Sequence, residues 1–112
     1  MMSALAMNDF KFFRDTDGAP RAAANDPSLS NLATFLESDI QDNRHVCINI
    51  LGDIISTRKG EKPYEFIGNG WILSYSPEFA AIACHAAEND DVTPLPPEKI
   101  ALALKDWLEF ID

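Results

Sequence analysis

Positive charge is scarce in this chain of 112 residues. Nine lysines and arginines stand against eighteen aspartates and glutamates, which leaves a net charge of -9. A phosphate backbone or an anionic lipid surface would be repelled by such a protein, so the composition argues against binding to nucleic acid or membranes. If the protein has a charged partner, that partner should be basic.

Cysteine and long apolar runs are also in short supply. The only two cysteines are Cys47 and Cys84, and no segment approaches the roughly 20 apolar residues needed to cross a bilayer. The opening MMSALAM lacks the charged n-region of a secretory signal. We therefore expect a cytoplasmic protein in which both thiols stay reduced.

The chain has few soft metal ligands and no residue that a motif marks as a nucleophile. Its soft ligands are His45, Cys47, Cys84 and His85. On a strand the last two would point to opposite faces, and on a helix the first two would lie about 200° apart, which does not suit a zinc site. No nucleophile-elbow pattern marks a serine or cysteine. We therefore expect no enzymatic activity, no catalytic residue, no metal and no cofactor, with both cysteines in the core.

The length and the 46% apolar content suit a single domain over residues 1–112. Residues 1–9 are a candidate disordered extension. The aromatic run at 10–14 predicts a strand or an ordered arm before a turn. The alanine-rich residues 19–26 show no clear period and are interpreted as a connection.

Two segments have clear helical signals. Asp26 and Pro27 supply a cap and a first-turn proline for a helix over residues 27–41, in which apolar residues recur at helical spacing. Pro97 opens a second such helix over residues 97–111, with an apolar stripe that includes Trp107.

Residues 46–58 fit both a strand and a helix, because their β-branched residues favour strands while their apolar spacing is helical. The stretch is long for a strand and ends at Lys59-Gly60, which is typical of a helix C-terminus. We predict a helix here.

After Pro63 the apolar pattern alternates, which predicts strands. Asn69-Gly70 favours a type I′ turn between strands 64–68 and 71–76, and a further strand follows at 79–86. Residues 88–97 are interpreted as a polar loop. The predicted fold class is α+β: two N-terminal helices, an antiparallel sheet of three to four strands, and the helix 97–111 packed on the sheet.

The order of these pieces resembles the small immunity proteins of bacterial contact-dependent growth inhibition and related polymorphic-toxin systems. The resemblance covers about residues 46–111, and its best parts are Gly68-Asn69-Gly70-Trp71 and the closing Trp107-Leu108-Glu109-Phe110-Ile111. It implies a protein that binds and neutralises a cognate toxin C-terminal domain, often a basic nuclease, by covering its active site or substrate surface. Such a protein would act as a monomer or weak dimer.

The half of the chain after residue 62 holds nine acids and two bases, a net charge of -7. An acidic surface would accelerate association with a basic toxin. We place the partner-binding surface on five acids in strands and loops of this half: Glu65, Glu78, Glu88, Asp90 and Asp91. The residues 39–44 between the first two helices are the alternative surface. The alternative function is a small acidic adaptor or regulator of a basic protein.

Overall fold

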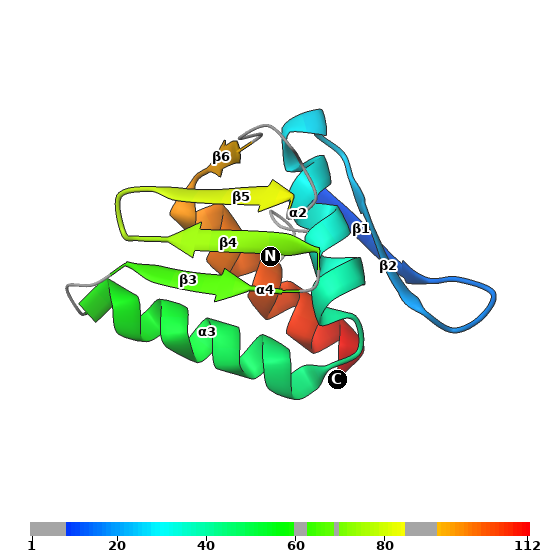
Figure 1. Cartoon of the computed structure of the whole chain (residues 1–112). Coiled ribbons are helices and arrows are strands. Elements are labelled where there is room, and N and C mark those ends of the chain that lie inside the picture. Colours follow the sequence, from blue (N-terminus) through cyan, green and yellow to red (C-terminus); the bar gives the residue numbers. More distant parts are fainter. Residues whose placement is uncertain (1–8, 60–62, 69, 85–91) are drawn as a thin grey trace.

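The computed structural model describes residues 9–59, 63–68, 70–84 and 92–112. Its central element is a four-stranded antiparallel sheet in which every strand pairs with the next along the chain (Figure 1). The strands are β3 (Tyr64–Ile67), β4 (Trp71–Tyr75), β5 (Ala80–Cys84) and β6 (Val92–Leu95). The predicted α+β class and antiparallel sheet are therefore confirmed.

Two long helices and one composite helical segment accompany the sheet. Helix α4 (Pro97–Ile111) passes behind the sheet in Figure 1, and α3 (Arg44–Lys59) runs alongside β3. The composite segment begins with the 3-10 turn η1 (Pro27–Leu29), continues as α2 (Ser30–Phe35) and ends as the π-helical turn η2 (Leu36–Ile40). The helices predicted at 46–58 and 97–111 are confirmed. The single helix predicted over 27–41 is instead a continuous segment of three helical types.

Between the helices and the sheet lies one core. The buried stripe predicted for the first helix is present, with Leu32, Phe35 and Leu36 fully enclosed. From α4 the indole of Trp107 is 0% exposed and packs edge-on against Phe12, with ring centroids 5.0 Å apart. Helix α4 thus joins the core, as predicted.

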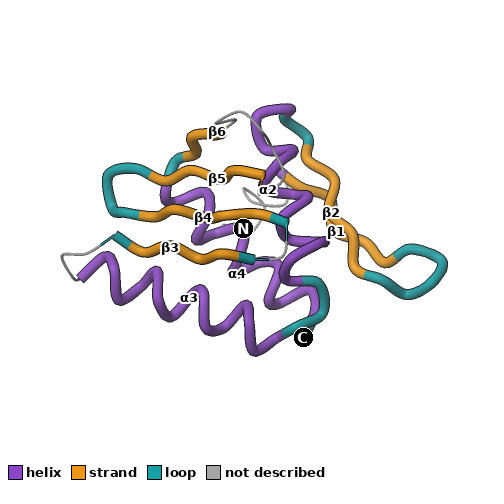
Figure 2. Tube along the Cα trace, in the orientation of Figure 1, coloured by secondary structure: helices purple, strands orange, loops and turns teal. Residues whose placement is uncertain are grey.

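A two-stranded ribbon projects beyond the sheet (Figure 2). Strand β1 (Phe10–Arg14) pairs antiparallel with β2 (Pro20–Ala24), so the interpretation of residues 19–26 as a connection is wrong. Alanines have little strand propensity, but here Ala22 and Ala24 pair with Phe12 and Phe10 of β1. The Ala22 N–H also donates to a Glu37 carboxylate oxygen from η2 at 2.8 Å. Tertiary contacts therefore determine this strand.

The fourth strand of the sheet is β6, so the interpretation of residues 88–97 as a loop is wrong for Val92–Leu95. Residues 88–91 lie outside the described residues. Pro94 of β6 is exposed at the sheet edge, where a missing N–H removes no ladder bond that the fold needs. Asn31 donates to the Thr93 hydroxyl at 2.7 Å and fastens β6 to α2.

The β3–β4 hairpin forms as predicted. The type I′ turn predicted for it includes Asn69, which lies outside the described residues, so the turn type stays a prediction. The Asp39 carboxylate of η2 accepts hydrogen bonds from the backbone N–H of Gly70 at 3.1 Å and of Trp71 at 2.9 Å. A Cβ on Gly68 would collide with that carboxylate. The glycine therefore allows Asp39 to approach.

Gln41, directly after η2, has a strained backbone. Its φ of 55° and ψ of -134° belong to a region that glycine adopts most easily. In this conformation its carbonyl oxygen accepts the indole N–H of Trp107 at 3.0 Å. The strain is thus part of the connection between η2 and α4.

We expect a Gln41→Gly variant to be more stable than Gln41→Ala by about 1 to 2 kcal/mol, because only glycine relieves the strain. Both variants lose the same exposed side-chain bond to Ser38, so the comparison isolates the backbone. Urea denaturation of the two variants measures the difference. Equal stabilities, or a more stable alanine variant, would contradict it.

Candidate functional site

The four-stranded sheet has one face toward the helices and one face without a helix. Side chains alternate along each strand, and Leu73, Tyr75, Ala80 and Ile82 point into the core, where all are at most 2% exposed. The opposite face, here called the open face, is formed by Glu65, Ile67, Ile72, Ser74, Ala81, Ala83, Val92 and Pro94. No helix of the described part of the chain covers it (Figure 1).

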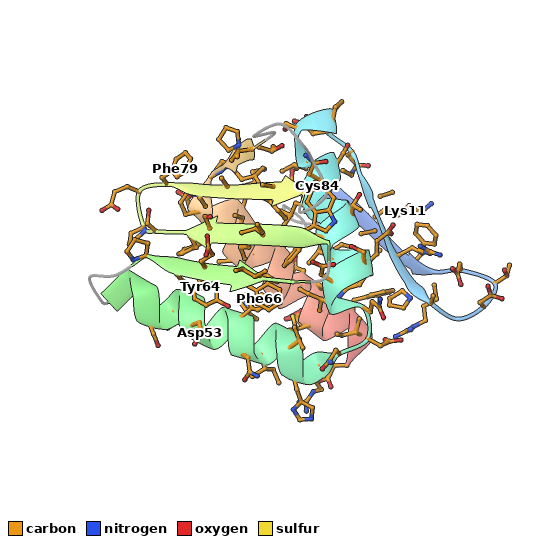
Figure 3. All side chains as sticks on the ribbon, in the orientation of Figure 1. Lys11, Asp53, Tyr64, Phe66, Phe79 and Cys84 are labelled. Atoms are coloured by element: carbon orange, nitrogen blue, oxygen red, sulfur yellow. The ribbon has the colours of Figure 1, made fainter. Side chains whose placement is uncertain are left out.

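The open face is apolar across its width. Ile67 on β3 is 59% exposed and Val92 on β6 is 48% exposed, while Ile72 and Ala83 between them are partly exposed. Phe79 before β5 is 56% exposed as well, at the end of the sheet (Figure 3). A contiguous apolar patch on a sheet is typical of an interaction surface.

The charge at this face has one sign. The four strands contain no lysine or arginine, and their single ionisable acid, Glu65, is exposed on the open face. Glu78 is exposed in the turn that joins β4 to β5. This turn is tight, because Ser76 and Phe79 exchange backbone hydrogen bonds of 2.7 and 3.3 Å. The rigid scaffold therefore presents an apolar surface with acidic side chains.

The structure brings two of the five predicted binding acids to the same end of the sheet. Tyr64 pairs with Tyr75 at the start of β3, so Glu65 lies near the turn that carries Glu78. Glu88, Asp90 and Asp91 lie outside the described residues. The segment that contains them begins after Cys84, which is at the opposite end of β5 from Glu78. A role for all five acids remains a prediction.

In the alternative surface, residues 39–44, the charged side chains already bind other groups of the protein. Asp39 holds the β3–β4 turn, Asp42 pairs with Arg14 at 3.0 Å, and Arg44 pairs with Asp112 at 2.8 Å. A partner that bound these groups would have to compete with existing pairs. This region is therefore less available for binding than the open face.

The residues considered for metal binding are dispersed. Cys47 is fully buried in α3, its thiol donates to the Leu104 carbonyl at 3.4 Å, and burial raises its pKa to about 11. Cys84 is partly buried on β5 and His45 is exposed on α3, while His85 lies outside the described residues. Within the described ranges, no three His, Cys, Asp or Glu side chains are grouped to hold a metal ion. The buried thiol of Cys47 acts as a core group.

One polar contact that the sequence did not reveal joins β3 to α3. The Tyr64 phenol hydrogen-bonds to Asp53, and burial together with the nearby carboxylate raises its pKa to about 12 (Figure 3). The contact attaches α3 to the outer strand of the sheet, where an unprotected edge could pair with another chain. With α3 attached along the β3 edge, the open face is the accessible surface of this strand.

The apolar residues of the open face were not identified from the sequence. Their signal was present, because Ile67 and Ile72 give their strands apolar residues on both faces, whereas the predicted helix 97–111 would cover only one face of the sheet. Phe79 was included in the predicted strand and its exposure was not expected.

Comparison with protein families, curated proteins and solved structures finds no match to this chain. Among the described residues, no helix combines the length and the apolar character required to span a membrane.

Proposed function

We propose that this protein is an immunity protein, which binds and neutralises a cognate bacterial toxin domain without catalysing a reaction. The toxin domain is a basic one, in the simplest case a nuclease, and the protein covers its active site or substrate surface. The observation that carries the proposal is the open face: an apolar surface on a rigid sheet, with acidic side chains and no cation in its strands.

The apolar part of the open face would supply the affinity. Interfaces obtain most of their binding energy from a few residues that become fully desolvated at their centre. Ile67, Ile72 and Val92 lie on adjacent or nearby strands and are already held in place by the ladder hydrogen bonds of the sheet. Binding would therefore lose little conformational entropy at these positions.

The acidic charge would accelerate association and make it selective for basic partners. A protein with a net charge of -9 attracts a basic domain over distances of about a Debye length, roughly 8 to 10 Å at physiological salt. Such attraction raises association rates by about 10 to 10³. The negative charge also repels nucleic acid. A nuclease inhibitor that displaces the substrate would therefore not bind that substrate itself.

Co-expression tests the proposal. The chain is produced in a bacterial host together with the C-terminal domain of a secreted toxin whose gene lies beside its own. We expect growth to be restored and the two chains to elute together in size exclusion, with an association rate that falls as salt rises. Continued growth arrest without a complex would overturn the proposal.

A further inference from the structure

A recess lies where the β1–β2 ribbon meets the C-terminal half of α4. It has a volume of about 590 Å³, and its lining combines aromatic rings with carboxylates. The rings are those of Phe10, Phe12 and Phe110, and the charged side chains are those of Asp106, Glu109 and Lys11. We call it the ribbon recess. None of its residues belongs to the open face.

Asp106 lines the ribbon recess and is partly exposed, but one of its two carboxylate oxygens is enclosed by the protein. Its Oδ2 atom is fully buried and accepts no hydrogen bond in the described part of the chain. Burial, followed by the charge of Glu109, raises the pKa of this carboxyl, and Lys105 partly opposes the shift. A buried acceptor without a donor destabilises a protein. The accessible acidic groups of the recess are the exposed carboxylate of Glu109 and the remaining oxygen of Asp106, and they favour a ligand that brings donors and positive charge.

The protein's own cations do not fill this role. Lys11 on β1 lines the recess and is exposed (Figure 3), but within the described residues it forms no ion pair with Asp106 or Glu109. Arg14 is directed elsewhere, since its guanidinium pairs with Asp42 at 3.0 Å. Glu109 is exposed and Asp106 is partly exposed, and in the part of the chain that the structure describes neither carboxylate forms an ion pair, so both can be approached by an external cation.

The aromatic cluster next to the recess already binds one guanidinium group. The Cζ atom of Arg14 lies 5.5 Å from the centre of the Phe110 ring. Phe110 in turn contacts Phe12 with a centroid distance of 5.6 Å. Aromatic rings attract cations through their negative faces, and the flat guanidinium group stacks on them more readily than an ammonium group does.

We propose that the ribbon recess binds a guanidinium group, either of free arginine or of an arginine side chain on another protein. Asp106 and Glu109 stand three positions apart and therefore share one side of α4. A guanidinium group presents five donors in a planar fork, which can serve two carboxylates while its plane rests on a phenyl ring. An ammonium group fits this arrangement less well.

Titration of the labelled protein, followed by amide chemical shifts, tests the proposal. The probes are N-acetyl-L-arginine amide, free L-arginine and N-acetyl-L-citrulline amide, which has the same length as the first but no charge. We expect both arginine compounds to shift residues of β1 and the end of α4, and the citrulline compound to bind about tenfold more weakly or less. Equal binding of the citrulline compound, or no shift with any probe, would overturn the proposal.

The two arginine probes also distinguish the source of the ligand. The blocked compound represents a side chain within a protein, whereas the free amino acid adds an ammonium and a carboxylate group. Stronger binding of the free amino acid would identify a small-molecule site. Equal or stronger binding of the blocked compound would identify a site for an arginine of a protein partner.

Asp106→Asn is the informative variant, and Glu98→Gln is its matched control because Glu98 is exposed in the first turn of α4, outside the recess. We expect Asp106→Asn to weaken arginine binding about tenfold or more and Glu98→Gln to leave it unchanged. Unchanged binding in Asp106→Asn would also overturn the proposal.

The Asp106→Asn protein should nevertheless be more stable at neutral pH, so that unfolding does not explain a loss of binding. Because the pKa of Asp106 is raised on folding, the unfolded chain releases this proton first as the pH rises. Glu109 and Lys105 on α4 and Lys11 on β1 are the charges around it. The gain should therefore vanish as the pH falls below 3.8, the ordinary pKa of the group.

This proposal is independent of the proposed function. A failed titration would not contradict toxin neutralisation by the open face. A failed co-expression would not contradict arginine binding at the ribbon recess.

Discussion

Replacing Trp107 with alanine lowers the free energy of unfolding by about 3 to 5 kcal/mol, because the indole is fully enclosed and alanine leaves a large cavity. Trp107 contacts the rings of Phe12 and Phe110 and donates to the Gln41 carbonyl. One residue therefore joins α4 to the ribbon and to the end of η2. A small domain has about 5 to 15 kcal/mol of total stability, so this variant is close to unfolding.

Two control variants separate the contributions to this loss. Trp107→Phe keeps most of the packing but leaves the Gln41 oxygen without its donor, so we expect a loss of about 1 to 3 kcal/mol. Trp71→Ala should also lose less than Trp107→Ala, because Trp71 is only partly buried. Denaturant titrations give the three values. A Trp107→Ala protein that unfolds at the same denaturant concentration as the original would contradict the description of the core.

Replacing Asp39 with alanine has the next largest expected effect, about 2 to 4 kcal/mol. Its carboxylate accepts the N–H groups of Gly70 and Trp71, and hydrogen bonds to a charged group contribute about 1.5 to 3 kcal/mol each. Asp39→Asn keeps one acceptor oxygen and should lose less. If Asp39→Ala proved as stable as the original in urea, the β3–β4 turn would not depend on this carboxylate.

A double-mutant cycle with Gly68 tests the same contact from the other side. A Cβ at residue 68 meets the Asp39 carboxylate, so Gly68→Ala should be strongly destabilising in the original protein. In the Asp39→Ala background this collision is absent and the cost of Gly68→Ala should be smaller. Additive effects of the two substitutions would show that the residues do not interact.

Local signals in the sequence were sufficient for most of the framework. Asp26 caps the first helical segment by accepting the Ser28 N–H at 2.9 Å, as the Asp-Pro pair predicted. The helix at 97–111 has the predicted bounds, and the alternating pattern after Pro63 located β3 and β4 within one residue of their observed ends. These elements follow from capping and from periodicity, which are properties of neighbouring residues.

The elements that the sequence did not predict depend on distant partners. Strand β2 is paired with β1 and bonded to Glu37, and β6 pairs with β5 and is fastened by Asn31. Neither strand has a strong pattern of its own. The role of Gly68 was not predicted for the same reason, because the Asp39 carboxylate that needs the space stands 29 positions earlier in the chain.

Of the candidate site, the sequence predicted only the acidic charge. The acidic half of the chain led to Glu65 and Glu78, which the structure places at one end of the sheet. The apolar centre of the open face could not be predicted, because it is exposed only where the helices pack on the other face of the sheet. Burial depends on the layer opposite a strand, and the strand's own residues do not specify that layer.

We propose that the open face binds the toxin domain, and two exposed isoleucines allow a matched test. Ile67 on the open face is 59% exposed and Ile55 on α3 is 52% exposed, so Ile67→Lys and Ile55→Lys add the same charge at similar cost to folding. The affinity of each variant for the co-expressed toxin domain is the decisive measurement. We expect Ile67→Lys to weaken binding about tenfold or more and Ile55→Lys to change it less than about threefold. Equal affinities of the two variants, or stronger weakening by Ile55→Lys, would contradict the claim.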